Sequence, residues 1–268
     1  MKFTYLALKT VVAVWLATAA VAENFTLAVT PWFHNSGLSD VLVPQIKTDT
    51  GLGVNRLVVG IGQLIRLGKA GDIDAILVHA RAGEATFVAE GYRTRRREIT
   101  FNDFVVIGLK ADPAEVQFAN TVGECFGAPS DAPALFVGRG DDSEPHRRGQ
   151  AIWKKAGVTP DPAWWRELGF GMGATLNTAA AMGAYTLSER ASWLNFDNKD
   201  GMAILFSGDF ALQNQYAYLA INPASHPHVA YKAAVTLENW LMSQKGQSLI
   251  GGYKIDGETL FTRNAKVR

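Results

Sequence analysis

Continuous apolar runs alternate with amphipathic segments along the first part of the chain. The run at 75–78 is typical of a parallel strand that is buried on both faces. Apolar positions at helical spacing predict a helix after each strand. Strands and helices are expected in turn at 25–30, 38–51, 54–59, 62–67, 75–78 and 82–90. This spacing is that of βαβ units, and it predicts a mostly parallel sheet.

The second half of the chain continues the alternation with shorter apolar runs. Expected strands lie at 104–109, 134–137, 203–206 and 216–221, and expected helices end near Gly157, Met182 and Met242. The segments 104–109 and 216–221 are expected to cross between two lobes. Lobe 1 would comprise 23–107 and 217–268, and lobe 2 would comprise 108–216. We expect a ligand cleft between the lobes, which would close by a hinge.

The first residues have the pattern of a secretory signal peptide. Lys2 precedes an apolar run from Leu6 to Leu16, and Ala20-Val21-Ala22 supplies the small residues of a cleavage site. The run is too short for a stable membrane span, which needs about 20 residues. We expect residues 1–22 to be removed and the mature protein to be soluble in the periplasm. An uncleaved anchor is the alternative.

Composition and charge narrow the choice of partners. The chain is 48% hydrophobic and 19% charged, which is ordinary for a globular protein. Loss of Lys2 and Lys9 with the leader would leave 24 basic and 25 acidic residues, which gives no field for nucleic acid or anionic membranes. The single cysteine, Cys125, allows neither an intramolecular disulfide nor a lipid anchor at the predicted cleavage site. We expect a monomer without a cofactor.

Three loops are candidates for ligand binding because each follows a strand and precedes a helix. They are 30–36, 138–143 and 169–175. In open α/β sheets ligands bind at the carboxyl ends of the strands, where helix N-termini attract anions. Arg139, in the second loop, adds a guanidinium fork that is suited to a carboxylate or an oxyanion.

The order of motifs over nearly all of the mature chain resembles the periplasmic tungstate-binding proteins of TupA type. The matching segments are 35–38, 60–63, 71–80, 87–92, 102–108, 139–143, 171–176, 183–187, 222–223, 226–228, 240–241 and 246–247. The resemblance implies a type II periplasmic-binding fold, α/β with mixed, mostly parallel sheets and a ligand cleft between two lobes. It also implies a solute-binding protein that captures a small anion such as tungstate or molybdate for an inner-membrane ABC permease.

Ligand-binding residues follow from the three loops and from this resemblance. We expect them to be Thr30, Trp32, Asn35, Ser36, Arg139, Gly173, Ala174, Thr175 and Trp193. We expect no catalytic residue and no metal ligand.

Departures from the family pattern leave a second ligand open. The family's run of hydroxyl residues in the first loop is reduced to Thr30, and Gly138 stands where the family has a serine. Glu144 would repel an anion if it faced the cleft. The alternative ligand is a larger planar molecule with a carboxylate, for example a quinone-type redox cofactor, stacked on Trp32 with Trp193 as an opposite wall, for uptake or for sensing.

Other polar residues favour structural roles. An enzyme would need a nucleophile with a base, and neither Cys125 nor Ser143 has such a partner in a motif. We expect Asp141-Asp142 to cap the next helix, and Arg93 with Arg95-Arg96-Arg97 to form a solvated face. His79 is expected to be a hydrogen-bonded structural residue, and His226 with His228 a surface turn rather than a metal site.

Overall fold

A computed structural model describes residues 25–79, 81–141, 143–199 and 201–265. The predicted signal peptide lies outside these residues. Within the described part of the chain, no helix is long and apolar enough to cross a membrane.

The first part of the fold is a sheet built on parallel strands. β1 (Phe25–Val29) pairs in parallel with both β2 (Val54–Val58) and β3 (Ala75–Val78), and β3 pairs antiparallel with β9 (Gln213–Ile221). The associated helices are α1 (Pro31–Asn35), α2 (Leu38–Thr50), α3 (Ile61–Ala70), α4 (Arg81–Ala89), α9 (Tyr231–Met242) and α10 (Gln244–Gly252). This alternation of strand and helix confirms the βαβ prediction for the first part of the chain.

The second part is a smaller sheet with its own helices. β5 (Phe136–Gly138) pairs in parallel with β6 (Trp165–Glu167) and with β7 (Tyr185–Glu189), and β8 (Met202–Phe206) lies beside β4 (Arg93–Leu109). Its helices are α5 (Val122–Gly127), α6 (Glu144–Ala156), α7 (Met172–Met182) and α8 (Arg190–Leu194), with 3-10 turns η1 (Val116–Phe118), η2 (Ala128–Ser130) and η3 (Phe210–Leu212). An apolar core around Phe126, Phe136 and Trp153 holds this part together.

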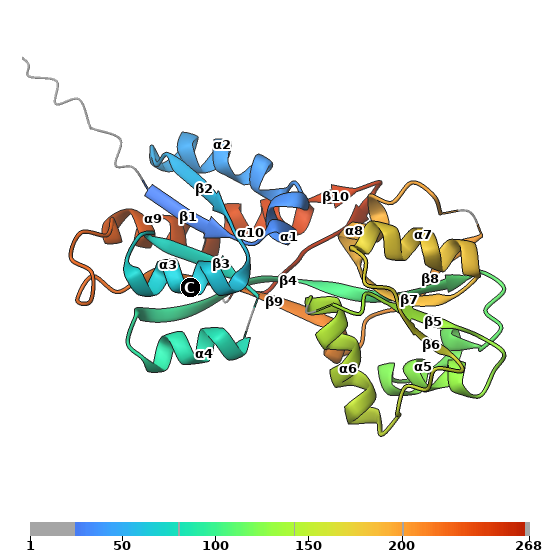
Figure 1. Cartoon of the computed structure of the whole chain (residues 1–268). Helices are drawn as coiled ribbons and strands as arrows, with labels where there is room; N and C mark the ends of the chain where they lie inside the picture. The colour runs from blue at the N-terminus through green and yellow to red at the C-terminus, as the bar shows by residue number, and fades with distance from the viewer. Residues whose placement is uncertain (1–24, 80, 142, 200, 266–268) are drawn as a thin grey trace, which may run out of the picture.

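Two long strands connect the parts (Figure 1). β4 pairs with β9 as far as Asp103 and then with β7 and β8 from Phe104 onward, so a single strand belongs to both sheets. The strand order is β2-β1-β3-β9-β4-β7-β5-β6, and β12 (Thr262–Arg263) also pairs with β4. The predicted lobe boundaries, 107/108 and 216/217, fall inside β4 and β9 and stay a prediction.

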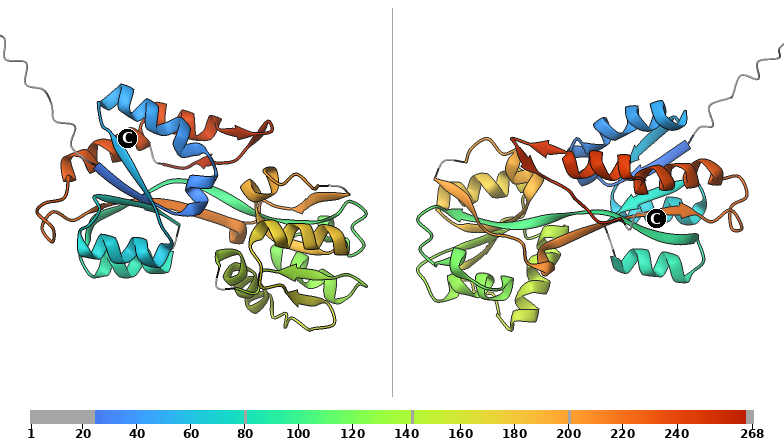
Figure 2. Two further views of the ribbon diagram at one scale, coloured as in Figure 1. Left: turned by 45° about the horizontal axis from the view of Figure 1, so that its top comes forward. Right: turned by 180° about the vertical axis from the view of Figure 1, so that it is seen from behind.

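A third connection comes from the C-terminal hairpin of β10 (Lys254–Ile255) and β11 (Glu258–Thr259). Figure 2 shows it extending from the first part of the fold toward the second. Glu258 forms an ion pair with Arg190 at 3.4 Å, and Asp256 approaches Lys199 at 3.9 Å. Arg190 also binds Asp103 through two hydrogen bonds of 2.7 and 2.6 Å, which fix α8 to β4.

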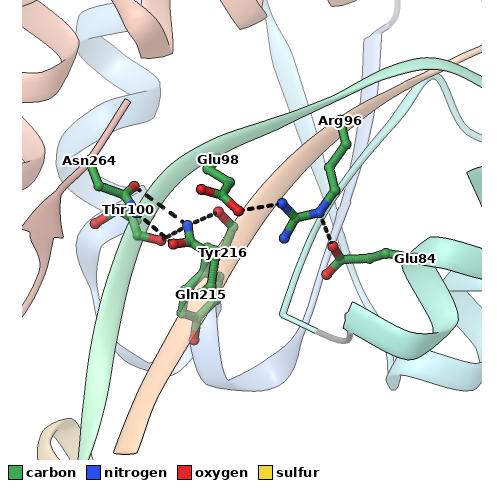
Figure 3. A network of polar contacts seen from close by, with 7 residues as sticks. All are labelled: Glu84, Arg96, Glu98, Thr100, Gln215, Tyr216 and Asn264. Atoms are coloured by element: carbon green, nitrogen blue, oxygen red, sulfur yellow. Dashed lines mark hydrogen bonds and ion pairs between the residues drawn. The ribbon is translucent and has the colours of Figure 1, made fainter. Parts of the chain in front are cut away.

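The arginine-rich segment that was predicted to form a solvated face is the start of β4, and the prediction is wrong for two of its residues, Arg96 and Arg97. Arg96 binds Glu84 at 2.5 Å and Glu98 at 2.6 Å (Figure 3), and Arg97 binds Glu238 at 2.9 Å. The side chains of Glu84 and Glu238 are each 1% exposed. Because buried carboxylates require compensating charge, these arginines are held inside the fold.

Of two turns for which the sequence made predictions, one is as expected and the other differs. His228 lies on the surface as expected, and its ring Nε2 hydrogen-bonds the carbonyl oxygen of Gly71 at 2.9 Å. Ser143, rather than Asp141-Asp142, is the N-cap residue of α6. Asp141 instead accepts hydrogen bonds from the Ser143 backbone and hydroxyl, which form a turn just before the helix.

Candidate functional site

The carboxyl ends of β1 and β3 lie beside β9, near the place where β4 passes from one sheet to the other; we call this place the junction of β4 and β9. β3 ends at Val78, and the ring of the next residue, His79, lies 4.8 Å from the ring of Tyr216 on β9. Phe33 of α1 approaches the same tyrosine at 5.7 Å. Burial, and then the positive charge of Arg148 on α6 of the second part, lowers the pKa of His79. The junction therefore lies at the carboxyl ends of β1 and β3, and ligands of α/β proteins bind at such strand ends.

The first predicted loop is folded around its own hydroxyl groups. Thr30 is buried, and its Oγ1 accepts the Phe33 amide at 3.4 Å, which caps α1. Ser36 is also buried; its Oγ donates to the Phe33 carbonyl at 2.7 Å and accepts from the Leu38 amide at 3.4 Å. Both hydroxyls thus stabilise the loop. α1 is a separate short helix, which the sequence did not indicate.

The remaining residues of this loop differ in exposure. Asn35 is exposed at the end of α1, and Trp32 is half-buried with its ring against the main apolar core. Asn35 and Ser36, of residue types that commonly cap helices, precede α2 without capping it. The cap residue is Gly37, with a φ of 78° and no side-chain hydrogen bond. Its left-handed backbone lets the chain turn between α1 and α2.

Arg139 lies in the second loop, beside the end of β5. Its Nη2 donates to Asp141 Oδ2 at 2.5 Å, while its buried Nε has no hydrogen-bond partner among the described residues. Burial acts to raise the pKa of Asp141, but hydrogen bonds from Ser143 and the charge of Arg139 lower it overall. Asp141 is therefore an ionised carboxylate that orients one edge of the guanidinium and leaves Nε for another acceptor.

Glu144 does not present a free negative charge. Its Oε1 lies 3.1 Å from Nη2 of Arg148, one turn further along α6. Arg148 also donates to the carbonyl oxygens of Ala211 and Gln213 at 2.9 and 3.2 Å, and its guanidinium lies over the ring of Phe104. The ion pair offsets the repulsion that Glu144 was expected to exert on an anion.

The third loop leads into α7, whose N-cap is Gly171. Gly173 and Ala174 lie exposed in its first turn, where backbone N–H groups have no partner within the helix. The hydroxyl of buried Thr175 donates to the Gly171 carbonyl at 3.1 Å, so it serves the helix itself.

Trp193, expected as an aromatic wall, lies in α8 and is 6% exposed. Its ring is 6.0 Å from that of Phe196, and Lys199 Nζ lies over it at 5.7 Å. These contacts are those of a packed residue. A ligand could reach this ring only if the packing opened.

Three buried polar residues that the sequence reasoning did not place in the site have unsatisfied atoms here. They are His79 at Nδ1, Asn102 at Oδ1 and Glu189 at Oε2, none of which has a hydrogen-bond partner among the described residues. His79 is therefore not the hydrogen-bonded residue that was predicted. Burial, followed by the charge of Arg148, lowers the pKa of His79 to about 4. Burial raises the pKa of Glu189 to about 8.

Unsatisfied buried polar atoms are rare in folded proteins and indicate a missing partner. His79 and Asn102 lie within segments that carry the family resemblance, and this was the available signal for them. Glu189 lay just beyond such a segment, at the end of a strand that the sequence did not predict.

Comparisons with known proteins identify the family to which the chain belongs. A family model described as a PBP superfamily domain matches residues 17–245. The tungstate-binding protein TupA of Peptoclostridium acidaminophilum is 36% identical over 90% of this chain and 86% of its own length. The structure of a tungstate-binding protein TupA from Desulfovibrio alaskensis superposes with a TM-score of 0.86 at 37% identity, over 90% of this chain and 99% of that one.

A further crystal structure, described as the tungstate ABC transporter from Geobacter sulfurreducens, is 37% identical. It covers 86% of this chain and 99% of its own, with a TM-score of 0.74. The predicted type II periplasmic-binding fold is thus confirmed, and the chain belongs to the PBP superfamily and, within it, to the TupA-type binding proteins.

Proposed function

We propose that this protein is the solute-binding component of an ABC importer and that it captures an oxyanion, tungstate or molybdate, at the junction of β4 and β9. The observation that carries the proposal is the unsatisfied Nε of Arg139 among other unsatisfied buried polar atoms. The names of the relatives, which describe tungstate-binding proteins, support the choice of anion.

The charges around the site favour an anion. Arg148 offsets Glu144, and Asp141 engages only one edge of Arg139. His79 and Glu189 are neutral at pH 7 because their pKa values are about 4 and about 8. A guanidinium with a free donor and neutral polar neighbours suits a ligand that brings its own negative charge.

A binding protein fits the described residues better than an enzyme does. Burial raises the pKa of the Cys125 thiol, which makes it a poor nucleophile. The Ser143 hydroxyl donates to Asp141 in a turn. We infer that the chain works in the periplasm with an inner-membrane permease, and that lobes bounded within β4 and β9 close on the anion.

A thermal-shift titration tests this function. Tungstate and molybdate should raise the melting temperature, because a ligand that binds only the folded state stabilises it by mass action. A tenfold excess over the dissociation constant adds about 1.4 kcal/mol. Sulfate at the same concentration is the comparison anion, and the anion should be recovered unchanged. No shift with tungstate or molybdate at millimolar concentration would end the proposal.

The periplasmic location makes a separate prediction about processing. Cleavage after Ala22 should leave Glu23 as the N-terminal residue, since Ala20-Val21-Ala22 forms the recognition site. N-terminal sequencing of protein from a periplasmic extract measures this. A retained Met1 in that fraction would contradict it.

The hydrogen bonding of the first loop, 30–36, favours a second class of ligand, a planar molecule with a carboxylate. The hydroxyls of Thr30 and Ser36 form hydrogen bonds with the backbone of the loop. Trp32 is half-buried, which leaves part of its ring open to a planar ligand. If such a ligand stacks there, Trp32→Ala should lose about 1–3 kcal/mol of binding, by analogy with stacked bases. If the ligand is a small oxyanion, Trp32→Phe should leave affinity unchanged. Isothermal calorimetry of both variants separates the two ligands.

A further inference from the structure

Glu189 is a buried carboxyl with one oxygen that no hydrogen bond within the described chain satisfies. It ends β7, is 3% exposed, and its Oε2 has no hydrogen-bond partner among the described residues. Burying an ionised carboxylate without a partner is costly. A group in this state is therefore held neutral, completed by a ligand, or both.

The sheet topology places Glu189 near Arg139. β5 and β7 are parallel, with Val137 opposite Thr186, so both chains leave the sheet at the same edge. Alternation along β7 puts Glu189 on the same face as Leu187. Leu187 and Arg139 line one small pocket between β5 and α6.

The charged and titratable neighbours of Glu189 come from the loop after β5, from α6, from α8 and from β9. Burial raises the pKa of Glu189 to about 8; a hydrogen bond from its own backbone and the charge of Arg139 act to lower it, and Glu144 at the start of α6 acts to raise it. Across the junction, burial and then the charge of Glu189 raise the pKa of Tyr216 on β9. The adjacent Arg190 is engaged by Asp103. At neutral pH the Glu189 carboxyl therefore keeps its proton.

We propose that Glu189 binds the anion as a neutral carboxylic acid, donating its proton in a hydrogen bond to a ligand oxygen that Arg139 also contacts. This inference rests on the proposed function and adds a specificity-determining residue to the same site. It requires a ligand with a fully deprotonated, acceptor oxygen at this position, as in a tetrahedral dianion. The guanidinium supplies charge, and the acid supplies a donor without adding net charge.

The sign of the pH dependence follows. Below about pH 8 the carboxyl is protonated and can donate, so affinity is at its maximum. Above that value the free site carries a carboxylate that repels the dianion, and binding must take up a proton. If only the protonated form binds, the affinity should fall on the order of 30-fold between pH 7 and about pH 9.5.

The experiment is a calorimetric titration of tungstate into the wild-type protein and into Glu189→Gln across this pH range. Glutamine keeps the size and offers an N–H donor but does not titrate, so the variant should bind within about threefold of wild type at pH 7 and lose the pH dependence. Glu167→Gln, at the exposed last residue of β6, is the matched control and should retain the wild-type profile.

A second measurement needs no variant. In two buffers of different ionisation enthalpy at about pH 9, wild-type binding should take up close to one proton per tungstate. Wild-type affinity that stays constant within twofold and shows no proton uptake would overturn the role of Glu189 and leave the proposed function intact. An unchanged pH profile in a folded Glu189→Gln variant would also overturn it. Absence of tungstate binding at every pH would remove both the function and the inference.

Discussion

Replacement of Arg139 by alanine is expected to weaken binding of the anion at least tenfold while the fold is retained. Hydrogen bonds to charged groups contribute about 1.5–3 kcal/mol, and the variant loses a guanidinium whose buried Nε has no hydrogen-bond partner among the described residues. It also releases Asp141, now bound to Arg139 at 2.5 Å, as an uncompensated carboxylate near the ligand. Calorimetric dissociation constants at pH 7 measure the effect.

Two variants make this result specific to the guanidinium. Arg139→Lys keeps the charge but not the planar fork, so its affinity should fall between those of wild type and alanine. Lys154→Ala removes one positive charge from the exposed last turn of α6 and should leave affinity unchanged. An Arg139→Ala protein that binds as tightly as wild type would show that this residue does not hold the ligand.

The largest loss of stability is expected at Trp153. This residue is 1% exposed and packs edge-on against Phe136 and Trp165, at centroid distances of 5.3 and 4.4 Å. Its indole also donates to the carbonyl of Phe126 at 3.1 Å. Trp153→Ala should lower the free energy of unfolding by about 3–5 kcal/mol through loss of packing and the cavity left behind.

Equilibrium denaturation with urea measures this change, and Trp153→Phe is the matched control. Phenylalanine retains a ring but leaves the Phe126 carbonyl without its donor, so it should cost less than alanine does. Because α6 carries Glu144 and Arg148 to the junction, the alanine variant should also bind anion more weakly. A loss below about 1 kcal/mol would contradict the packing that positions α6.

Most elements with a clear apolar period could be predicted from the sequence. The strand at 75–78 coincides with β3, and the helix expected at 38–51 is α2, Leu38–Thr50. These elements contact the core through one apolar face or one apolar run, so the local pattern of apolar residues is sufficient to predict their secondary structure.

The missed elements depend on distant parts of the chain. β7 is buried throughout although Thr186, Ser188 and Glu189 are polar, because it lies between β4 and β5 in the sheet. No local period indicates such a strand. The start of β4 was likewise misassigned because Arg97 finds its partner, Glu238, on a helix 141 residues later.

The candidate site was predictable only in part for the same reason. Arg139 could be predicted from its place after a strand and before a helix. Glu189 acquires its raised pKa from burial and its surroundings from β5, α6 and β9, which come together only in the folded chain. Ser36 and Trp193 were predicted to bind the ligand. In the fold, the Ser36 hydroxyl bonds to the backbone of its own loop, and the Trp193 ring packs against Phe196.

A crystal structure of the mature protein with tungstate, with the ion located by the anomalous scattering of tungsten, is the direct test of the proposed binding site. We expect one strong peak at the junction of β4 and β9, with the anion's oxygens within hydrogen-bonding distance of both Arg139 and Glu189. A peak elsewhere on the protein, or no peak in crystals grown with an excess of tungstate, would contradict it.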